Sequence, residues 1–146
     1  MTAFGEGGRG RFEVLEHTAD VGFSAEAPTP ALLFETAALA LFEIAADTAA
    51  AEARTSLPVE VTGEDYPSLL VNFLSELLYL FDTGRFVPAQ VRVEAVSPTA
   101  ISARLSGQAR DPARHPWKLI VKAVTYHGLE VVDRGDRWTA RVFLDV

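Results

Sequence analysis

The 146-residue chain contains no cysteine. This absence excludes disulfide bonds, thiolate nucleophiles, and zinc or iron–sulfur sites that cysteine would ligate. Lysine is scarce as well, because Lys118 and Lys122 are the only lysines in the sequence. A chain without disulfides suits a reducing compartment, so we expect a cytoplasmic protein.

Long hydrophobic runs are also missing. Apolar residues make up 49% of the chain, but charged residues divide them into short runs. None approaches the roughly twenty residues that a membrane-spanning helix needs, so we expect no membrane span. Residues 1–10 are rich in glycine and lack the apolar centre of a secretory signal. We therefore predict a flexible leader over 1–10 and a single domain over 11–146.

Basic residues are fewer than acidic ones: the chain has 13 Lys and Arg and 20 Asp and Glu, which gives a formal net charge of −7. Such a chain repels phosphate backbones over long range. We find no basic run interleaved with aromatic residues, and no Gly-x-Ser-x-Gly or phosphate-loop motif. RNA is therefore expected to reach this protein only through a partner, and no common hydrolytic motif is present.

Two segments have the spacing of amphipathic helices. The first is predicted to begin at Thr29, as the cap, with Pro30 at the first helical position, and to end near Asp47. The second opens at Pro67 and repeats apolar residues at intervals of three and four. Gly84 follows it, where a left-handed residue commonly ends a helix.

The remaining segments alternate apolar and polar residues with the period of a strand that has one buried face. These predicted strands lie at 11–15, 21–25, 57–63, 91–95, 101–105, 131–132 and 138–144. The run 119–126 can be a buried strand or a helical turn, and we favour the strand. The pattern predicts an α+β fold, a mainly antiparallel sheet with two amphipathic helices packed on one face.

Segment 16–20, between the first two predicted strands, contains Glu16, His17 and Asp20. Two carboxylates and an imidazole at a strand junction are typical of a functional loop, although a capped turn with solvated charges explains them as well. His127, beside the turn residue Gly128, has a similar alternative, because histidines at turns commonly bond a backbone group.

Near the end of the sequence, Lys122 interrupts an apolar run. Its ammonium must either face water from a strand or meet a carboxylate. Asp145 is followed by Val146, so a side-chain carboxylate and a terminal carboxylate can stand together. If Asp20 came near, these hard oxygen ligands would suit calcium or magnesium, and the alternative is solvated terminal charge.

Four segments together make the sequence resemble the archease family. They are EHTADVG at 16–22, LSELLYLFD at 74–82, KAVTYHGLEV at 122–131 and LDV at 144–146. The resemblance covers nearly everything from Phe12 onward. The four segments occur in the family's order and in a chain of the family's length.

The resemblance implies a protein cofactor, not an enzyme, that activates the GTP-dependent RNA-splicing ligase in tRNA splicing or RNA repair. Archeases promote guanylylation of that ligase and its multiple turnover. The family's metal site corresponds to Asp20 and Asp145, with Val146 able to add oxygen ligands. His17, Lys122 and His127 match further motif positions and are expected to contribute to partner contact or to support the site.

The metal implied by the resemblance is a divalent ion, with calcium expected and magnesium or manganese as alternatives. Two other classes of function remain open. One is a freestanding metal-dependent hydrolase that uses Asp20 and Asp145. The other is a general chaperone or adaptor whose partner binding would not need these aspartates.

Overall fold

The structure is a computed structural model that describes residues 4–7, 10–17 and 20–146, with the side chains of 10–15 and 21–146. Nine strands and two helices follow one another along these residues. The elements are β1 (Phe4–Gly7), β2 (Gly10–His17), β3 (Asp20–Ala27), α1 (Pro30–Ala45), β4 (Thr55–Thr62), α2 (Tyr66–Asp82), β5 (Val87–Val96), β6 (Ala100–Gln108), β7 (Ala123–Val124), β8 (Glu130–Asp133) and β9 (Trp138–Asp145).

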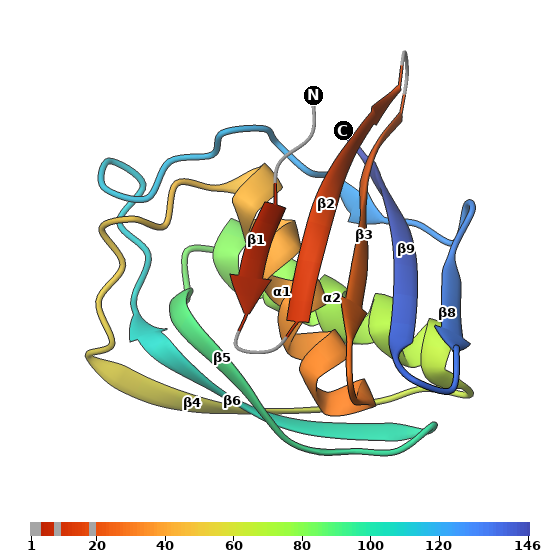
Figure 1. The fold of residues 1–146 in the computed structure, drawn as a ribbon. Coiled ribbons are helices and arrows are strands. Elements are labelled where there is room, and N and C mark those ends of the chain that lie inside the picture. The colour runs from red at the N-terminus through yellow and green to blue at the C-terminus, as the bar shows by residue number, and fades with distance from the viewer. Residues whose placement is uncertain (1–3, 8–9, 18–19) are drawn as a thin grey trace.

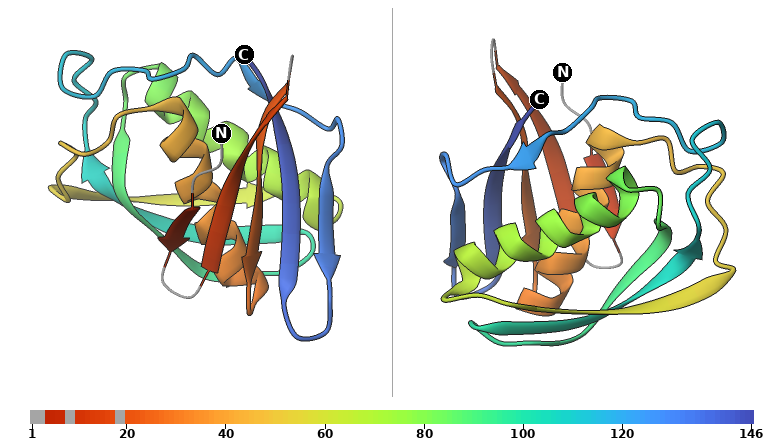
Figure 2. Two further views of the ribbon diagram at one scale, coloured as in Figure 1. Left: turned by 45° about the horizontal axis from the view of Figure 1, so that its top comes forward. Right: turned by 180° about the vertical axis from the view of Figure 1, so that it is seen from behind.

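The strands form two antiparallel sheets. The larger sheet has six strands in the order β1-β2-β3-β9-β7, with β8 also paired to β9. The smaller sheet has the order β4-β6-β5. Both helices lie between the sheets, α1 against β2, β3 and β5, and α2 mainly against β4 and β7 (Figures 1 and 2). The α+β prediction is confirmed, and the structure divides the strands between two sheets that enclose the helices.

Both helices begin at side-chain caps. The Thr29 hydroxyl accepts a 3.2 Å hydrogen bond from the Leu32 amide, and Pro30 occupies the first turn of α1. The Asp65 carboxylate accepts a 2.8 Å hydrogen bond from the Ser68 amide, which closes a capping box at the start of α2. Gly84 follows α2 with a φ of 77°, the left-handed conformation predicted for this glycine.

Aromatic side chains join the two helices and the loop that precedes β7. The rings of Phe34 and Phe73 lie 6.0 Å apart, and those of Phe42 and Phe81 lie 5.8 Å apart. Trp117 meets Phe81 edge to face at 4.8 Å. These contacts fix the loop around Trp117 against the helix layer.

The strand prediction for 119–126 is wrong for most of that run, since only Ala123 and Val124 form a strand. The amides of Lys118 and Leu119 both donate to the carbonyl of Ala45, at 2.8 and 3.3 Å. The end of α1 therefore holds the chain away from the sheet until β7 begins. Periodicity cannot reveal this, because the competing hydrogen bonds come from a distant segment.

The segment predicted as a leader, residues 1–10, contains a short strand that the sequence pattern did not indicate. Residues 4–7 form strand β1, which pairs antiparallel with β2. An edge strand of this kind is held by backbone hydrogen bonds, so its glycine-rich sequence carries little of the usual strand pattern. Gly10, at the start of β2, packs so closely on Thr36 that a Cβ there would collide with the threonine hydroxyl.

No helix in the described part of the chain is both long enough and apolar enough to cross a bilayer.

Candidate functional site

The register between β3 and β9 brings two predicted metal ligands to one end of the larger sheet. Val21 pairs with Leu144. Asp20 precedes Val21 as the first residue of β3, and Asp145 follows Leu144 as the last residue of β9. Their backbone positions are therefore neighbours on adjacent antiparallel strands.

His17 belongs to the same end of the sheet, because its backbone pairs with that of Asp20 across the β2–β3 ladder. The side chains of His17 and Asp20 lie outside the described residues, and so does the Thr18–Ala19 link between them. The structure thus places these two predicted residues by backbone position alone.

Lys122 approaches Asp145 from the edge of β9 that faces away from β3. Its amide donates a 2.7 Å hydrogen bond to the Asp145 carbonyl, and the next residue, Ala123, pairs with Asp145. The Lys122 side chain is exposed. The end of β9 therefore lies between β3 and β7, and Figures 1 and 2 show it beside the segment that carries β7.

Asp145 belongs to the face of the sheet that points away from the helices. Val142 and Leu144 are buried, with exposed fractions of 0% and 5%. Because successive side chains of a strand point to opposite faces, Arg141, Phe143 and Asp145 share the outer face. The Asp145 side chain is exposed there and forms no ion pair with any side chain that the structure describes.

Phe143 lies against two glycines of the motif segments. A Cβ at Gly22 would come within 2.8 Å of the Phe143 ring, and a Cβ at Gly128 within 2.9 Å. Both distances are too short for real side-chain contacts, so the ring can occupy this place only over glycines. Sequence reasoning missed Phe143, although Gly22 and Gly128, each inside a motif segment, are the signal that could have indicated a close approach.

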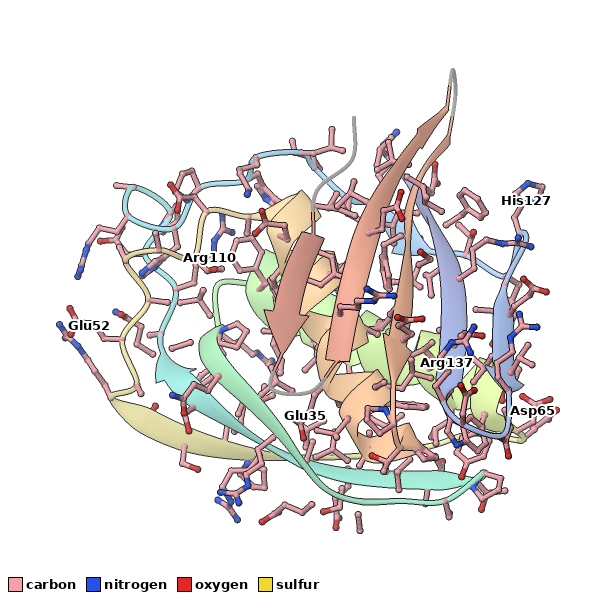
Figure 3. The ribbon with its side chains drawn as sticks, in the orientation of Figure 1. Glu35, Glu52, Asp65, Arg110, His127 and Arg137 are labelled. Carbon is pink, nitrogen blue, oxygen red and sulfur yellow. The ribbon has the colours of Figure 1, made fainter. Side chains whose placement is uncertain are left out.

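His127 lies near the same outer face of the sheet, because its ring contacts that of Phe143. Its ring centroid lies 6.0 Å from that of Phe143, and its side chain is exposed (Figure 3). Gly128 has a φ of 64°, and its carbonyl accepts a 3.1 Å hydrogen bond from Arg141. Arg141 also pairs with Glu130 at 3.1 Å. The imidazole therefore stands beside the strand that carries Asp145, held by a ring contact and an ordered turn.

The donor set at this end of the sheet suits a hard cation. Asp145 and Val146 are both exposed and offer oxygen ligands, which calcium and magnesium prefer. Among the side chains that the structure describes, no three from His, Cys, Asp and Glu gather as a ready site, and Asp20 is outside that set. A complete site would accordingly need Asp20, a partner's ligands, or both.

Glu52 lies far from this end of the sheet, on the opposite side of the molecule from His127 in Figure 3. The Arg54 guanidinium, by a 2.9 Å hydrogen bond and by its charge, lowers the pKa of Glu52 below its ordinary value of 4.5, and Arg114 adds to the effect. The three side chains tie the 46–54 connector to the loop that follows β6.

The sequence is similar to known archeases over nearly its whole length. The Archease protein family matches residues 12–146. Over 140 residues the chain is 41% identical to protein archease of Methanosarcina acetivorans, covering 93% of this chain and 96% of that protein. Protein archease of Pyrococcus furiosus is 36% identical over 140 residues, covering 93% of this chain and 99% of that protein.

Two solved structures share the fold. The solution structure of protein 1598 from Methanobacterium thermoautotrophicum has a TM-score of 0.74 and 36% identity, covering 92% of this chain and 98% of that one. The crystal structure of an archease from Thermotoga maritima, described as a possible chaperone, has a TM-score of 0.64 and 19% identity, covering 90% of this chain and 94% of that one. The second similarity concerns the fold alone.

Proposed function

The chain belongs to the archease family, and we propose that it is a metal-binding protein cofactor of the GTP-dependent RNA-splicing ligase. It would promote guanylylation and multiple turnover of that ligase in tRNA splicing or RNA repair, in the cytoplasm. The observation that carries the proposal is the register of β3 and β9, which brings the backbones of Asp20 and Asp145 to one end of the sheet.

Asp20 and Asp145 would hold the metal, and Val146 would add oxygen ligands. A divalent ion, calcium first and magnesium or manganese as alternatives, would supply positive charge and open coordination positions there. The outer-face position of Asp145 supports this assignment, because a carboxylate that is exposed can reach a partner while it still binds a cation. Phe143 and its two glycines keep the end of β9 close to β3 and to the turn at Gly128.

The ligase itself would carry out the guanylylation and ligation reactions. The chain would dock with this end of the sheet and present its carboxylates beside the nucleotide site of the ligase, so that the guanylylated state is favoured. His17, Lys122 and His127 would contribute to partner contact or support the site. Lys122 and His127 are suited to contact because their side chains are exposed, and both belong to the segment that pairs with β9 on the edge away from β3.

The charge balance supports an indirect relation to RNA. At a net charge of −7 the chain repels a phosphate backbone, whereas a protein partner can supply the basic surface that RNA requires. RNA would thus be bound by the ligase and not by this chain.

A multiple-turnover ligation assay with the cognate ligase tests the proposal. We expect several rounds of ligation per ligase molecule when this protein is present and about one round when it is absent. The difference should be lost when divalent ions are chelated in a reaction whose ligase has been preloaded with GTP. Equal turnover with and without the protein would contradict the proposal. Hydrolysis of a phosphoester by the protein alone would favour the hydrolase alternative, and full stimulation after loss of both aspartates would favour the adaptor alternative.

A further inference from the structure

The loop between β6 and β7, residues 109–122, passes the carboxyl-terminal ends of both helices before it reaches Asp145 (Figure 2). At the end of α1, two amides of this loop donate to the Ala45 carbonyl. At the end of the loop, the Lys122 amide donates to the Asp145 carbonyl at 2.7 Å. The place of Lys122 beside Asp145 therefore depends on the contacts that hold the 109–122 loop.

The side chain of Arg110 ties this loop to the end of α2 (Figure 3). Its Nη1 donates a 3.3 Å hydrogen bond to the Phe81 carbonyl, and its Nε donates a 3.0 Å hydrogen bond to the His115 carbonyl. The guanidinium carbon lies 4.0 Å from the centre of the Phe81 ring and 5.5 Å from the centre of the Trp117 ring. Two carbonyls and two aromatic rings, from α2 and from the loop itself, thus hold the cation.

A positive charge suits this position. Carbonyls at the carboxyl-terminal end of a helix carry partial negative charge, and the last turn of α2 has no basic residue of its own. Asp82, in that turn, is exposed, and no carboxylate among the described side chains forms an ion pair with Arg110. A neutral side chain at this position would lose the two hydrogen bonds and the attraction to the rings.

Trp117 connects this arrangement to the segment that reaches Asp145. Its ring meets that of Phe81 edge to face at 4.8 Å, and its backbone forms a bridge to Ala46. Lys122 is the fifth residue after Trp117, and Val121, just before Lys122, is buried. A shift of Trp117 would accordingly move one end of a short segment whose other end is the Lys122 hydrogen bond.

We infer that Arg110 is a positioning residue for the end of the larger sheet: it fixes Trp117 and, through the loop, the place of Lys122 beside Asp145. Its effect on the ligase rests on the proposed function, under which Lys122 supports the site. Other residues form the β3–β9 ladder, which makes Asp20 and Asp145 neighbours. Loss of Arg110 should therefore reduce stimulation of the ligase and leave metal binding unchanged.

The fourth motif segment, 74–82, gains a connection to the site in this way. It forms the carboxyl-terminal part of α2 and contains Phe81, whose ring and carbonyl both contact Arg110. Through Arg110 and the 109–122 loop, this segment would act on the same end of the sheet as the other three.

The first test needs no ligase. Hydrogen exchange of backbone amides, followed by NMR on the intact chain, would compare the wild type with Arg110→Ala and Arg110→Lys. Arg114→Ala is the matched control, because Arg114 belongs to the same loop and pairs with Glu52 at 3.5 Å.

In Arg110→Ala the Lys122 amide should exchange at least about tenfold faster, because hydrogen bonds from a charged donor are worth that factor. Arg110→Lys should exchange at least about threefold faster, since lysine keeps the charge but lacks the planar group that stacks and donates to two carbonyls. This milder variant decides the test if Arg110→Ala does not fold. Amides of the β3–β9 ladder, and the Lys122 amide of the control, should stay within about twofold of the wild type.

The second test measures turnover of the cognate ligase and calorimetric titration with calcium. Arg110→Ala should lower stimulation at least about tenfold, because a misplaced group costs a site much of its activity. Its Kd for calcium should stay within about twofold of the wild-type value, since Arg110 is distant in the chain from the expected ligands. Arg114→Ala should match the wild type in both measurements.

Unchanged exchange of the Lys122 amide in the folded variants would overturn the inference, and so would an equal rise throughout the β3–β9 ladder. Full stimulation by a variant whose Lys122 amide exchanges faster would overturn it as well. Failure of the wild-type protein to stimulate the ligase would overturn the proposed function, and the exchange measurement would still decide whether Arg110 positions Lys122.

Discussion

The amide of Lys122 donates a 2.7 Å hydrogen bond to the carbonyl of Asp145. This bond joins two of the motif segments, 122–131 and 144–146, which are separate in the sequence. With Val21 paired to Leu144 on the other side of β9, it also brings the 16–22 segment to the same place. Three of the four motif segments thus meet at one end of the six-stranded sheet.

Asp20→Asn and Asp145→Asn should each abolish stimulation of the ligase and weaken binding of divalent ions. Both changes keep the side-chain shape, so the fold should persist, and removal of like charge should leave stability unchanged or higher without metal. Turnover assays and calorimetric metal titration would measure these effects. Asp136→Asn, at the turn before β9, is the control, and full stimulation with unaltered metal binding by both site variants would exclude a shared site.

Gly22→Ala should destabilise the protein by about 1–3 kcal/mol, because the new methyl group would collide with the carbonyl of Val142 as well as the ring of Phe143. Chemical denaturation would measure the loss. Adding Phe143→Ala should not restore stability, since the backbone carbonyl remains. Gly84→Ala is the comparison, because a Cβ there meets nothing within 4 Å and only the positive φ opposes it.

Leu74→Ala and Leu77→Ala should each lower the free energy of unfolding by roughly 2–5 kcal/mol. Both side chains are buried in the helix layer between the sheets, with 0% and 1% exposed. Denaturant titration provides the measurement. Tyr79→Ala, on the exposed side of the same helix, should change stability by only about 0.5 kcal/mol, and an equal loss at all three positions would mean that the buried stripe has been misidentified.

Arg54→Ala should raise the pKa of Glu52 toward its ordinary value. Arg54 is the larger cause of the lowered pKa, ahead of Arg114. Because the folded state holds this pKa low, the ion pairs stabilise the fold above pH 4.5 and lose that effect as the pH falls through the lowered pKa. Carbon-detected NMR titration of the Glu52 carboxyl would compare Arg54→Ala with the wild type, and an unchanged midpoint would contradict the assignment to Arg54.

The helices could be predicted from the sequence because their causes are local. Pro30 and the Thr29 cap begin α1. The leucines and phenylalanines of α2 recur with the helical period, and Gly84 ends that helix. The hairpin of β5 and β6 was predictable for the same reason, since alternation and turn residues lie within a short stretch of chain.

The 119–126 run was predicted incorrectly, and the strand at residues 4–7 was not predicted, because both structures depend on partners elsewhere in the chain. The Ala45 carbonyl holds the first segment, and pairing with β2 makes a strand of residues 4–7. Phe143 was overlooked for a related reason, because its place is defined by two glycines that belong to other strands and turns.

By itself the sequence determined the residue chemistry of the candidate site: carboxylates without thiolates, a negative net charge, and the four motif segments. It could not determine that Asp20 and Asp145 lie at one end of one sheet, because strand order depends on which edges pair after the chain collapses. Only the tertiary structure decided that β9 inserts between β3 and β7. The physical reason is that backbone pairing and burial of Val142 and Leu144 against the helices act between segments more than a hundred residues apart.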